Sequence, residues 1–133
     1  MTDKKLYNWC FACGKDNPIG LHLHFDQTED ELLTTFIPRQ EHQSYDGRMH
    51  GGLISTLLDE AMGQFLYMKT GKPAYTAKLE VRFRQPVIIG ERVTVRTKVN
   101  KQKGRLVEMS ATMTKDDGIM VAEAAAKLMC EGE

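Results

Sequence analysis

Several features that would assign a protein to a class are missing from this sequence. Its 133 residues carry no net charge, because 18 Lys and Arg offset 18 Asp and Glu. The two signs are interspersed, so no basic patch indicates nucleic acid and no polybasic run indicates a membrane surface. No apolar run approaches the roughly 18 residues that span a bilayer, and the N-terminus lacks the apolar segment of a signal peptide. We expect one cytoplasmic domain over residues 1–133, with a small molecule and other subunits as partners.

Cysteine is scarce. Three cysteines without a secretion signal favour reduced thiols over a disulfide framework. Cys10 and Cys13 form a Cys-x-x-Cys pair, and His22 and His24 follow it. Together these four side chains would be enough ligands for a zinc ion. However, one residue separates the histidines, whereas structural zinc sites typically place three to five between them. No βαβ pattern indicates a redox pair either, so we predict no metal and no cofactor.

Motifs of nucleophilic hydrolases are also absent. No sequence pattern around Cys10, Cys13 or Cys130 marks an activated thiol. No Gly-x-Ser-x-Gly segment forms the nucleophile elbow of a serine hydrolase. Any hydrolytic activity must therefore rest on other groups.

Alternation of apolar and polar residues predicts strands on both sides of a single helix. Residues 1–20 are rich in turn-forming residues and predict an irregular lead-in. The predicted strands cover residues 21–27, 31–37, 76–84, 93–99, 107–113 and 119–130, each half-buried. The last segment has helical propensity, but it follows the hairpin dipeptide Asp117-Gly118 and keeps a period of two, so we predict a strand.

The helix is predicted over about residues 50–68, and most of its circumference is apolar. The apolar positions are Leu53, Ile54, Leu57, Leu58, Ala61, Met62, Phe65 and Leu66. One helix between two and four strands predicts a single-domain α+β fold of order ββαββββ, in which the helix packs on the concave face of a curved antiparallel sheet.

A narrow stripe of this helix carries small residues and one carboxylate. Gly52, Thr56, Asp59 and Gly63 are spaced so that they share one side. Aspartate is a poor helix former, and a solvated stripe would carry long polar side chains, so we interpret Asp59 as functional. Gly51 and Gly52 expose the first amides of the helix, which favour developing negative charge.

These segments resemble a known family. Residues 50–63, residues 10–14 (Cys-Phe-Ala-Cys-Gly), residues 17–21 (Asn-Pro-Ile-Gly-Leu) and residues 82–86 (Arg-Phe-Arg-Gln-Pro) resemble hotdog-fold thioesterases of the phenylacetate-pathway (PaaI) type. The resemblance covers nearly the whole chain and agrees with the predicted fold. It implies hydrolysis of acyl-CoA thioesters to a free acid and CoA.

Thioester hydrolysis needs a donor for the carbonyl oxygen and a base or nucleophile near the carbonyl carbon. Gly51 and Asp59 are of suitable type, but eight residues of helix place them about 12 Å apart. The two groups must therefore come from two copies of the chain, which predicts a site at a dimer interface. The resemblance implies the same arrangement, with two sites per homodimer and often a dimer of dimers.

The resemblance also implies roles for individual residues. Gly51 matches the glycine whose amide points at the thioester oxygen, and His50 and Gly52 flank it at the substrate. Asp59 matches the carboxylate that activates water or attacks the carbonyl. Thr76 matches a hydroxyl that helps to hold the water. Where the family commonly has an amide side chain, this sequence has Ser44, with Gln43 beside it.

Structural roles stay open for three of these residues. His50 can serve only to hydrogen-bond backbone at the helix start, Gly51 only to allow close packing, and Thr76 only as a strand former. Two other functions also stay open: an acyl-CoA or apolar-ligand binding protein without chemistry, and a hotdog dehydratase or hydratase. The acyl group does not follow from the sequence.

Overall fold

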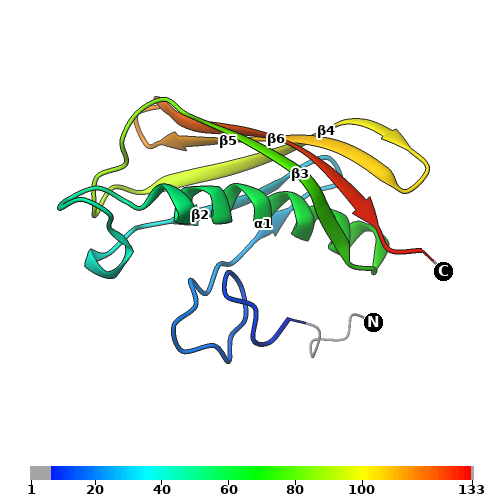
Figure 1. The fold of residues 1–133 in the computed structure, drawn as a ribbon, viewed down its shortest axis with the longest axis horizontal. Helices are drawn as coiled ribbons and strands as arrows, with labels where there is room; N and C mark the ends of the chain where they lie inside the picture. Colours follow the sequence, from blue (N-terminus) through cyan, green and yellow to red (C-terminus); the bar gives the residue numbers. More distant parts are fainter. Residues whose placement is uncertain (1–6, 133) are drawn as a thin grey trace.

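The computed structural model describes residues 7–132 and contains one long helix against one sheet (Figure 1). The elements in chain order are β1 (Asp26–Gln27), β2 (Leu32–Phe36), the short 3-10 helix η2 (Gln40–His42), α1 (Gly51–Thr70), β3 (Ala74–Phe83), β4 (Val93–Lys103), β5 (Leu106–Lys115) and β6 (Met120–Cys130). The predicted order ββαββββ is confirmed, including the strand assigned to the last segment.

The sheet is antiparallel throughout and its strands lie in the order β1-β2-β4-β5-β6-β3. Tight turns join β4 to β5 and β5 to β6, and Gly104 and Gly118 in these turns have φ of 61° and 88°, a region that favours glycine. The strand that follows the helix does not pair with the next strand in sequence. Instead β3 lies at the far edge beside β6, and β4 returns to the middle of the sheet.

Helix α1 lies along the inner side of the curved sheet and contacts β2 to β6 (Figure 1). Its buried residues are Ile54, Leu57, Leu58, Ala61, Met62, Gln64, Phe65, Leu66 and Tyr67. The predicted apolar face is therefore correct except at Leu53, which is half-buried. The helix ends at Gly71, whose φ of 75° makes a left-handed cap. Among the described residues, no helix has the length and hydropathy that crossing a membrane requires.

The first strand is shorter than predicted, with only Asp26–Gln27 in the sheet. The backbone of His22 has φ of 53°, which interrupts the extended conformation. On either side of it, the amides of Leu21 and Leu23 donate to the carbonyls of Phe11 and Ala12, at 2.8 and 3.0 Å. Residues 21–23 thus pair with the lead-in, which Figure 1 shows below the helix, on the side away from the sheet.

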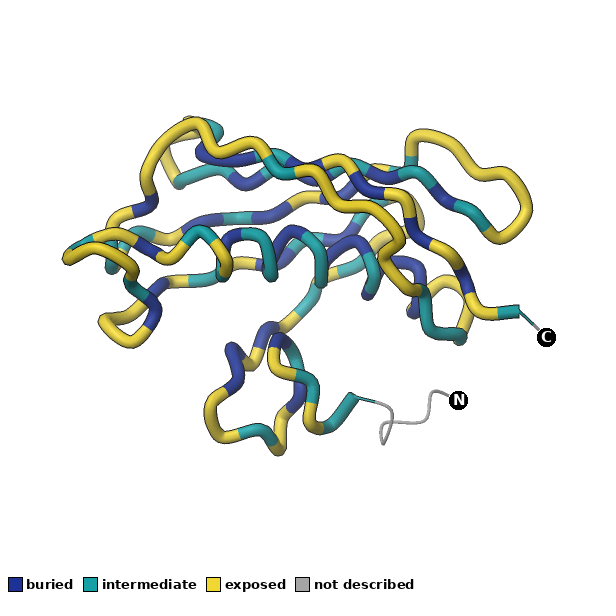
Figure 2. Tube along the Cα trace, in the orientation of Figure 1, coloured by how far each residue is buried: buried dark blue, intermediate teal, exposed yellow. Residues whose placement is uncertain are grey.

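The strand after the helix is far more exposed than the half-buried strand predicted. Tyr75, Leu79 and Phe83 on β3 are 58%, 37% and 53% exposed, and Figure 2 shows exposed residues along most of the strand. In the described chain β3 pairs only with β6, so its outer edge has no strand beside it. An unpaired edge strand with exposed apolar side chains can pair with another chain.

Candidate active site

The helix carboxylate and the strand hydroxyl singled out in the sequence meet in the structure. The Oγ1 of Thr76 donates a hydrogen bond to Oδ1 of Asp59 at 2.5 Å. Asp59 is half-buried on α1, and Thr76 is exposed near the start of β3. A β-bulge follows at once, because the register of β3 on β6 shifts between Thr76 and Lys78. The hydrogen bond therefore joins α1 to β3, the strand whose outer edge is unpaired in the described chain.

The start of the helix is capped by a histidine ring. The Nδ1 of His50 accepts a hydrogen bond from the amide of Gly52 at 2.9 Å. Within the described chain no group accepts from the amide of Gly51, which leaves that N–H as the donor at the helix start. A Cβ on Gly51 would lie 3.5 Å from the Phe83 ring, an ordinary contact, so packing alone does not require glycine there.

A single chain does not bring this amide to the carboxylate. Gly51 and Asp59 lie on one unbroken helix, and eight residues at the helical rise separate them by about 12 Å. Two groups that act on one carbonyl must both lie within about 3 Å of it. The Gly51 amide and the Asp59 carboxylate of one chain therefore cannot act on the same carbonyl.

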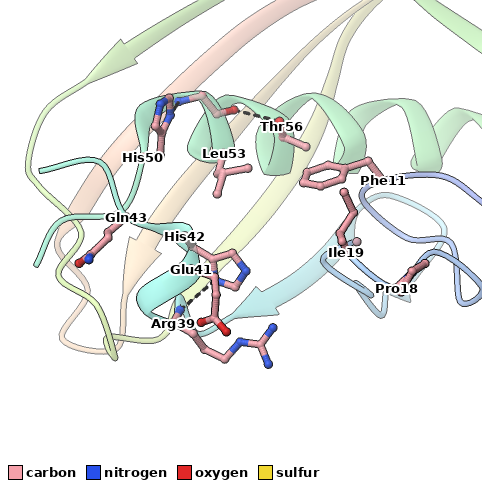
Figure 3. Close-up of a pocket in the computed structure, with 12 residues that line it drawn as sticks. Phe11, Pro18, Ile19, Arg39, Glu41, His42, Gln43, His50, Leu53 and Thr56 are labelled. Carbon is pink, nitrogen blue, oxygen red and sulfur yellow. Dashed lines mark hydrogen bonds between the residues drawn. The ribbon is translucent and has the colours of Figure 1, made fainter. Parts of the chain in front are cut away.

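A cavity of about 700 Å³ opens beside the helix start (Figure 3). It is lined by Phe11, Pro18, Ile19, Gly20, Arg39, Glu41, His42, Gln43, His50, Gly52, Leu53 and Thr56. Three of the predicted substrate-binding residues, His50, Gly52 and Gln43, are among them. Ser44 is not, and neither are Gly51, Asp59 and Thr76. The cavity is thus formed by the helix start, the segment before it and the lead-in.

The amide side chain of Gln43 forms a hydrogen bond within the loop before the helix. Its Oε1 accepts from the amide of Gly47 at 2.9 Å, which leaves Nε2 as the group that can donate to a ligand. The backbone of Ser44 donates to the carbonyl of Arg48 at 2.8 Å, and Ser44 is exposed. Gln43 is among the residues that line the cavity, and Ser44 is not.

Comparison with known proteins assigns a family. The model of the thioesterase superfamily matches residues 46–122, which include the whole helix and β3 to β5. The chain belongs to this superfamily. Its fold is the hotdog fold: the PaaI protein of the E. coli phenylacetic acid degradation operon superposes with a TM-score of 0.80 at 18% identity, over 90% of this chain and 84% of that one.

One sequence relative and one further structural neighbour carry names that mention coenzyme A. Acyl-coenzyme A thioesterase THEM4 of Bos taurus is 27% identical over 86% of this chain and 48% of its own length, so the chain spans about half of that relative. A hypothetical thioesterase protein of Streptococcus pneumoniae TIGR4, solved with coenzyme A, superposes with a TM-score of 0.76 at 18% identity, over 84% of this chain and 90% of that one.

Several residues around the cavity of this thioesterase-superfamily chain were not singled out in the sequence. His42 is buried, and its Nδ1 accepts from the amide of Arg39 at 2.9 Å. Burial lowers the pKa of His42 and the Arg39 cation lowers it further, while Glu41 partly opposes both. His42, Arg39 and Glu41 belong to the polar segment of residues 39–48, which the sequence pattern indicates only as a connection to the helix. This segment and the lead-in meet at the cavity only in the folded chain, so no local sequence pattern indicates that they lie together.

The cysteines lie apart from the cavity lining and all three are free thiols. Cys130 is buried on β6. Cys10 and Cys13 instead lie against Glu60 of the helix, with their Sγ atoms 3.7 and 3.1 Å from its Oε2. Burial and the neighbouring Glu60 carboxylate raise the pKa of the Cys13 thiol, which keeps it protonated and a poor nucleophile.

Proposed function

We propose that this chain hydrolyses acyl-CoA thioesters to a free acid and CoA at sites shared by two copies of the chain. The observation that carries the proposal is the hydrogen bond between Thr76 and Asp59, on the same helix as the unpaired amide of Gly51. The names of the THEM4 relative and of the coenzyme A complex support the substrate class. A cytoplasmic location stays a prediction from the sequence.

In the proposed reaction the thioester oxygen accepts from the Gly51 amide of one copy, and the helix dipole adds to this stabilisation. Asp59 of the other copy acts on the carbonyl carbon in one of two ways. As a general base it takes a proton from water, whose oxygen forms the new C–O bond; as a nucleophile it forms an anhydride that water then hydrolyses. In both routes the C–S bond breaks and the CoA sulfur leaves with a proton.

Thr76 is proposed to hold the Asp59 carboxylate in its reactive orientation. A short hydrogen bond from a hydroxyl to a carboxylate is of the strong, charge-assisted kind. The hydroxyl can also contact the attacking water, because both would lie at the same carboxylate oxygen.

The exposed edge of β3 supports a homodimer, with a dimer of dimers as the further prediction. Tyr75, Leu79 and Phe83 present apolar area to solvent on a strand that lacks an outer neighbour in the described chain. Covering this area with a second copy would remove it from water. Phe83 also lies beside Gly51, so an interface on β3 would reach the helix start.

The first experiment measures thiol release from a panel of aryl and aliphatic acyl-CoAs. Asp59→Asn is expected to keep the fold and to lower kcat by about 10²- to 10⁴-fold, the usual contribution of a positioned base. Asp26→Asn, at an exposed aspartate of β1, is the matched control and should retain wild-type turnover. Undiminished hydrolysis by Asp59→Asn would remove this carboxylate from the mechanism.

A mixing experiment tests the shared site. Gly51→Pro deletes the amide donor at the first helical position, where proline is tolerated. Each variant alone should be nearly inactive, but a heterodimer of Gly51→Pro with Asp59→Asn contains one intact site. Equal mixing after subunit exchange should restore about a quarter of the wild-type activity per chain, and no recovery in verified heterodimers would refute the shared site.

The panel also separates the other functions. Tight acyl-CoA binding by a folded dimer without thiol release would assign a binding protein. Hydration of an enoyl-CoA without release of CoA would assign a hydratase.

A further inference from the structure

A cluster of potential metal ligands lies between the lead-in and the helix, where Glu60 follows Asp59, and includes none of the proposed catalytic groups. It consists of the Sγ atoms of Cys10 and Cys13 and a carboxylate oxygen of Glu60, all within 4.8 Å of one another. The two thiols come from the lead-in and the carboxylate from α1. We propose that Cys10, Cys13 and Glu60 bind one zinc ion, with a fourth position left for water.

The distances fit a tetrahedral site. With Zn–S of about 2.3 Å and Zn–O of about 2.1 Å, sulfur and oxygen ligands lie about 3.6 Å apart. The corresponding distances here are 3.7 Å from Cys10 and 3.1 Å from Cys13 to the same oxygen, Oε2 of Glu60. Small adjustments of three side chains would therefore centre a zinc ion.

The lack of a basic partner for Glu60 also favours a bound cation. No basic side chain in the described part of the chain pairs with Glu60, although the ion pairs of other acidic residues are evident. Glu60 is half-buried, and the two thiols that contact its Oε2 are only weak hydrogen-bond donors. Zinc would displace the thiol protons into solvent and compensate the half-buried carboxylate.

The structure supplies a ligand that the sequence did not indicate. The sequence predicts no zinc site, because His22 and His24 are spaced differently from the second ligand pair of a structural zinc site. In the structure the Nε2 of His22 lies 2.6 Å from the carbonyl of Asn17, and Glu60, 47 residues after Cys13, takes the place of the second pair. Cys13 also lines a cavity of about 390 Å³, which gives the fourth position access to water.

The site would fasten the lead-in to the helix. Cys10 and Cys13 flank Phe11, which forms part of the wall of the larger cavity at the helix start. A metal bond to both thiols and to Glu60 would hold that wall against α1. The proposal concerns metal binding alone and does not depend on the proposed hydrolysis.

The test uses the full chain, fully reduced, with its three thiols verified by titration. Metal-free protein is titrated with Co²⁺, and the readout is a sulfur-to-cobalt charge-transfer band that one equivalent of Zn²⁺ abolishes. Cys13→Ser and Glu60→Gln should each weaken binding by at least about 100-fold, since loss of a direct ligand costs more than the 10- to 100-fold of an outer-sphere partner. Cys130→Ser and His22→Asn are the controls and should bind within about threefold of wild type.

Circular dichroism of each variant verifies its fold. The absence of a charge-transfer band in the reduced wild-type protein would overturn the proposal, and so would unchanged binding by Glu60→Gln. Binding that requires His22 while tolerating Glu60→Gln would also overturn it, in favour of a cysteine and histidine site.

Discussion

Replacing Thr76 by valine isolates the hydroxyl that contacts the Asp59 carboxylate. Valine has the same shape and suits a strand equally well, so the change removes the hydrogen bond and leaves the backbone of β3 in place. The bond is short, at 2.5 Å, and its acceptor is a carboxylate.

The expected size of the effect follows from this geometry. Hydrogen bonds to charged groups contribute about 1.5–3 kcal/mol, and the exposure of Thr76 favours the lower end. Since about 1.4 kcal/mol corresponds to a factor of ten, Thr76→Val should lower kcat about tenfold. KM should change little, because Thr76 does not line the cavity at the helix start.

The assay is steady-state thiol release from the best acyl-CoA of the panel. Thr76→Ser keeps the hydroxyl and should recover most of the lost kcat. Thr35→Val, at an exposed threonine of β2, is the matched control and should behave as wild type. In the Asp59→Asn background Thr76→Val should cost much less than tenfold, because the two residues act as a unit.

Two outcomes would refute this reasoning. The first is a kcat of Thr76→Val within twofold of wild type. The second is a tenfold loss that is equally large when Asp59 is already asparagine, because the hydroxyl would then act independently of the carboxylate.

Two further predictions concern stability. His50→Ala removes the ring that caps the helix and should lower the free energy of unfolding by about 1 kcal/mol in denaturant titrations, whereas His50→Asn, which restores an acceptor, should recover most of it. Burial lowers the pKa of His42 in the folded state, so the unfolded chain takes up its proton first as the pH falls. Stability should therefore decline as the pH drops below about 6.5, and His42→Asn should flatten this part of the profile; an identical slope in wild type and variant would contradict the assignment.

Much of the fold could be predicted because its signals are local. The helix is apolar around most of its circumference, and its observed end at Thr70 lies two residues beyond the predicted one. The segment Met120–Cys130 is a strand despite its alanines, because a hairpin turn and a period of two outweigh helical propensity. The sheet order could not be predicted, since alternation specifies which residues face the helix but not which strand lies beside β3.

The site could be predicted only in its parts. The small neighbours on the helix single out Asp59 as a candidate, and its hydrogen bond with Thr76 brings together two residues for which the resemblance implies a role. The cavity at the helix start could not be found this way, because Phe11, Ile19 and His42 meet there from segments without a periodic pattern.

Asp59 and Glu60 show how one helix can place adjacent carboxylates in different chemical environments. Successive helical residues point about 100° apart. Asp59 therefore reaches the hydroxyl of Thr76 at the edge of the sheet, while Glu60 reaches the thiols of Cys10 and Cys13 in the lead-in. A carboxylate beside a hydroxyl can exchange protons with a substrate, whereas a half-buried carboxylate beside two thiols is suited to hold a cation. Both residues carry a carboxylate. The groups that surround each one, and not its residue type, distinguish the proposed catalytic Asp59 from the proposed metal ligand Glu60.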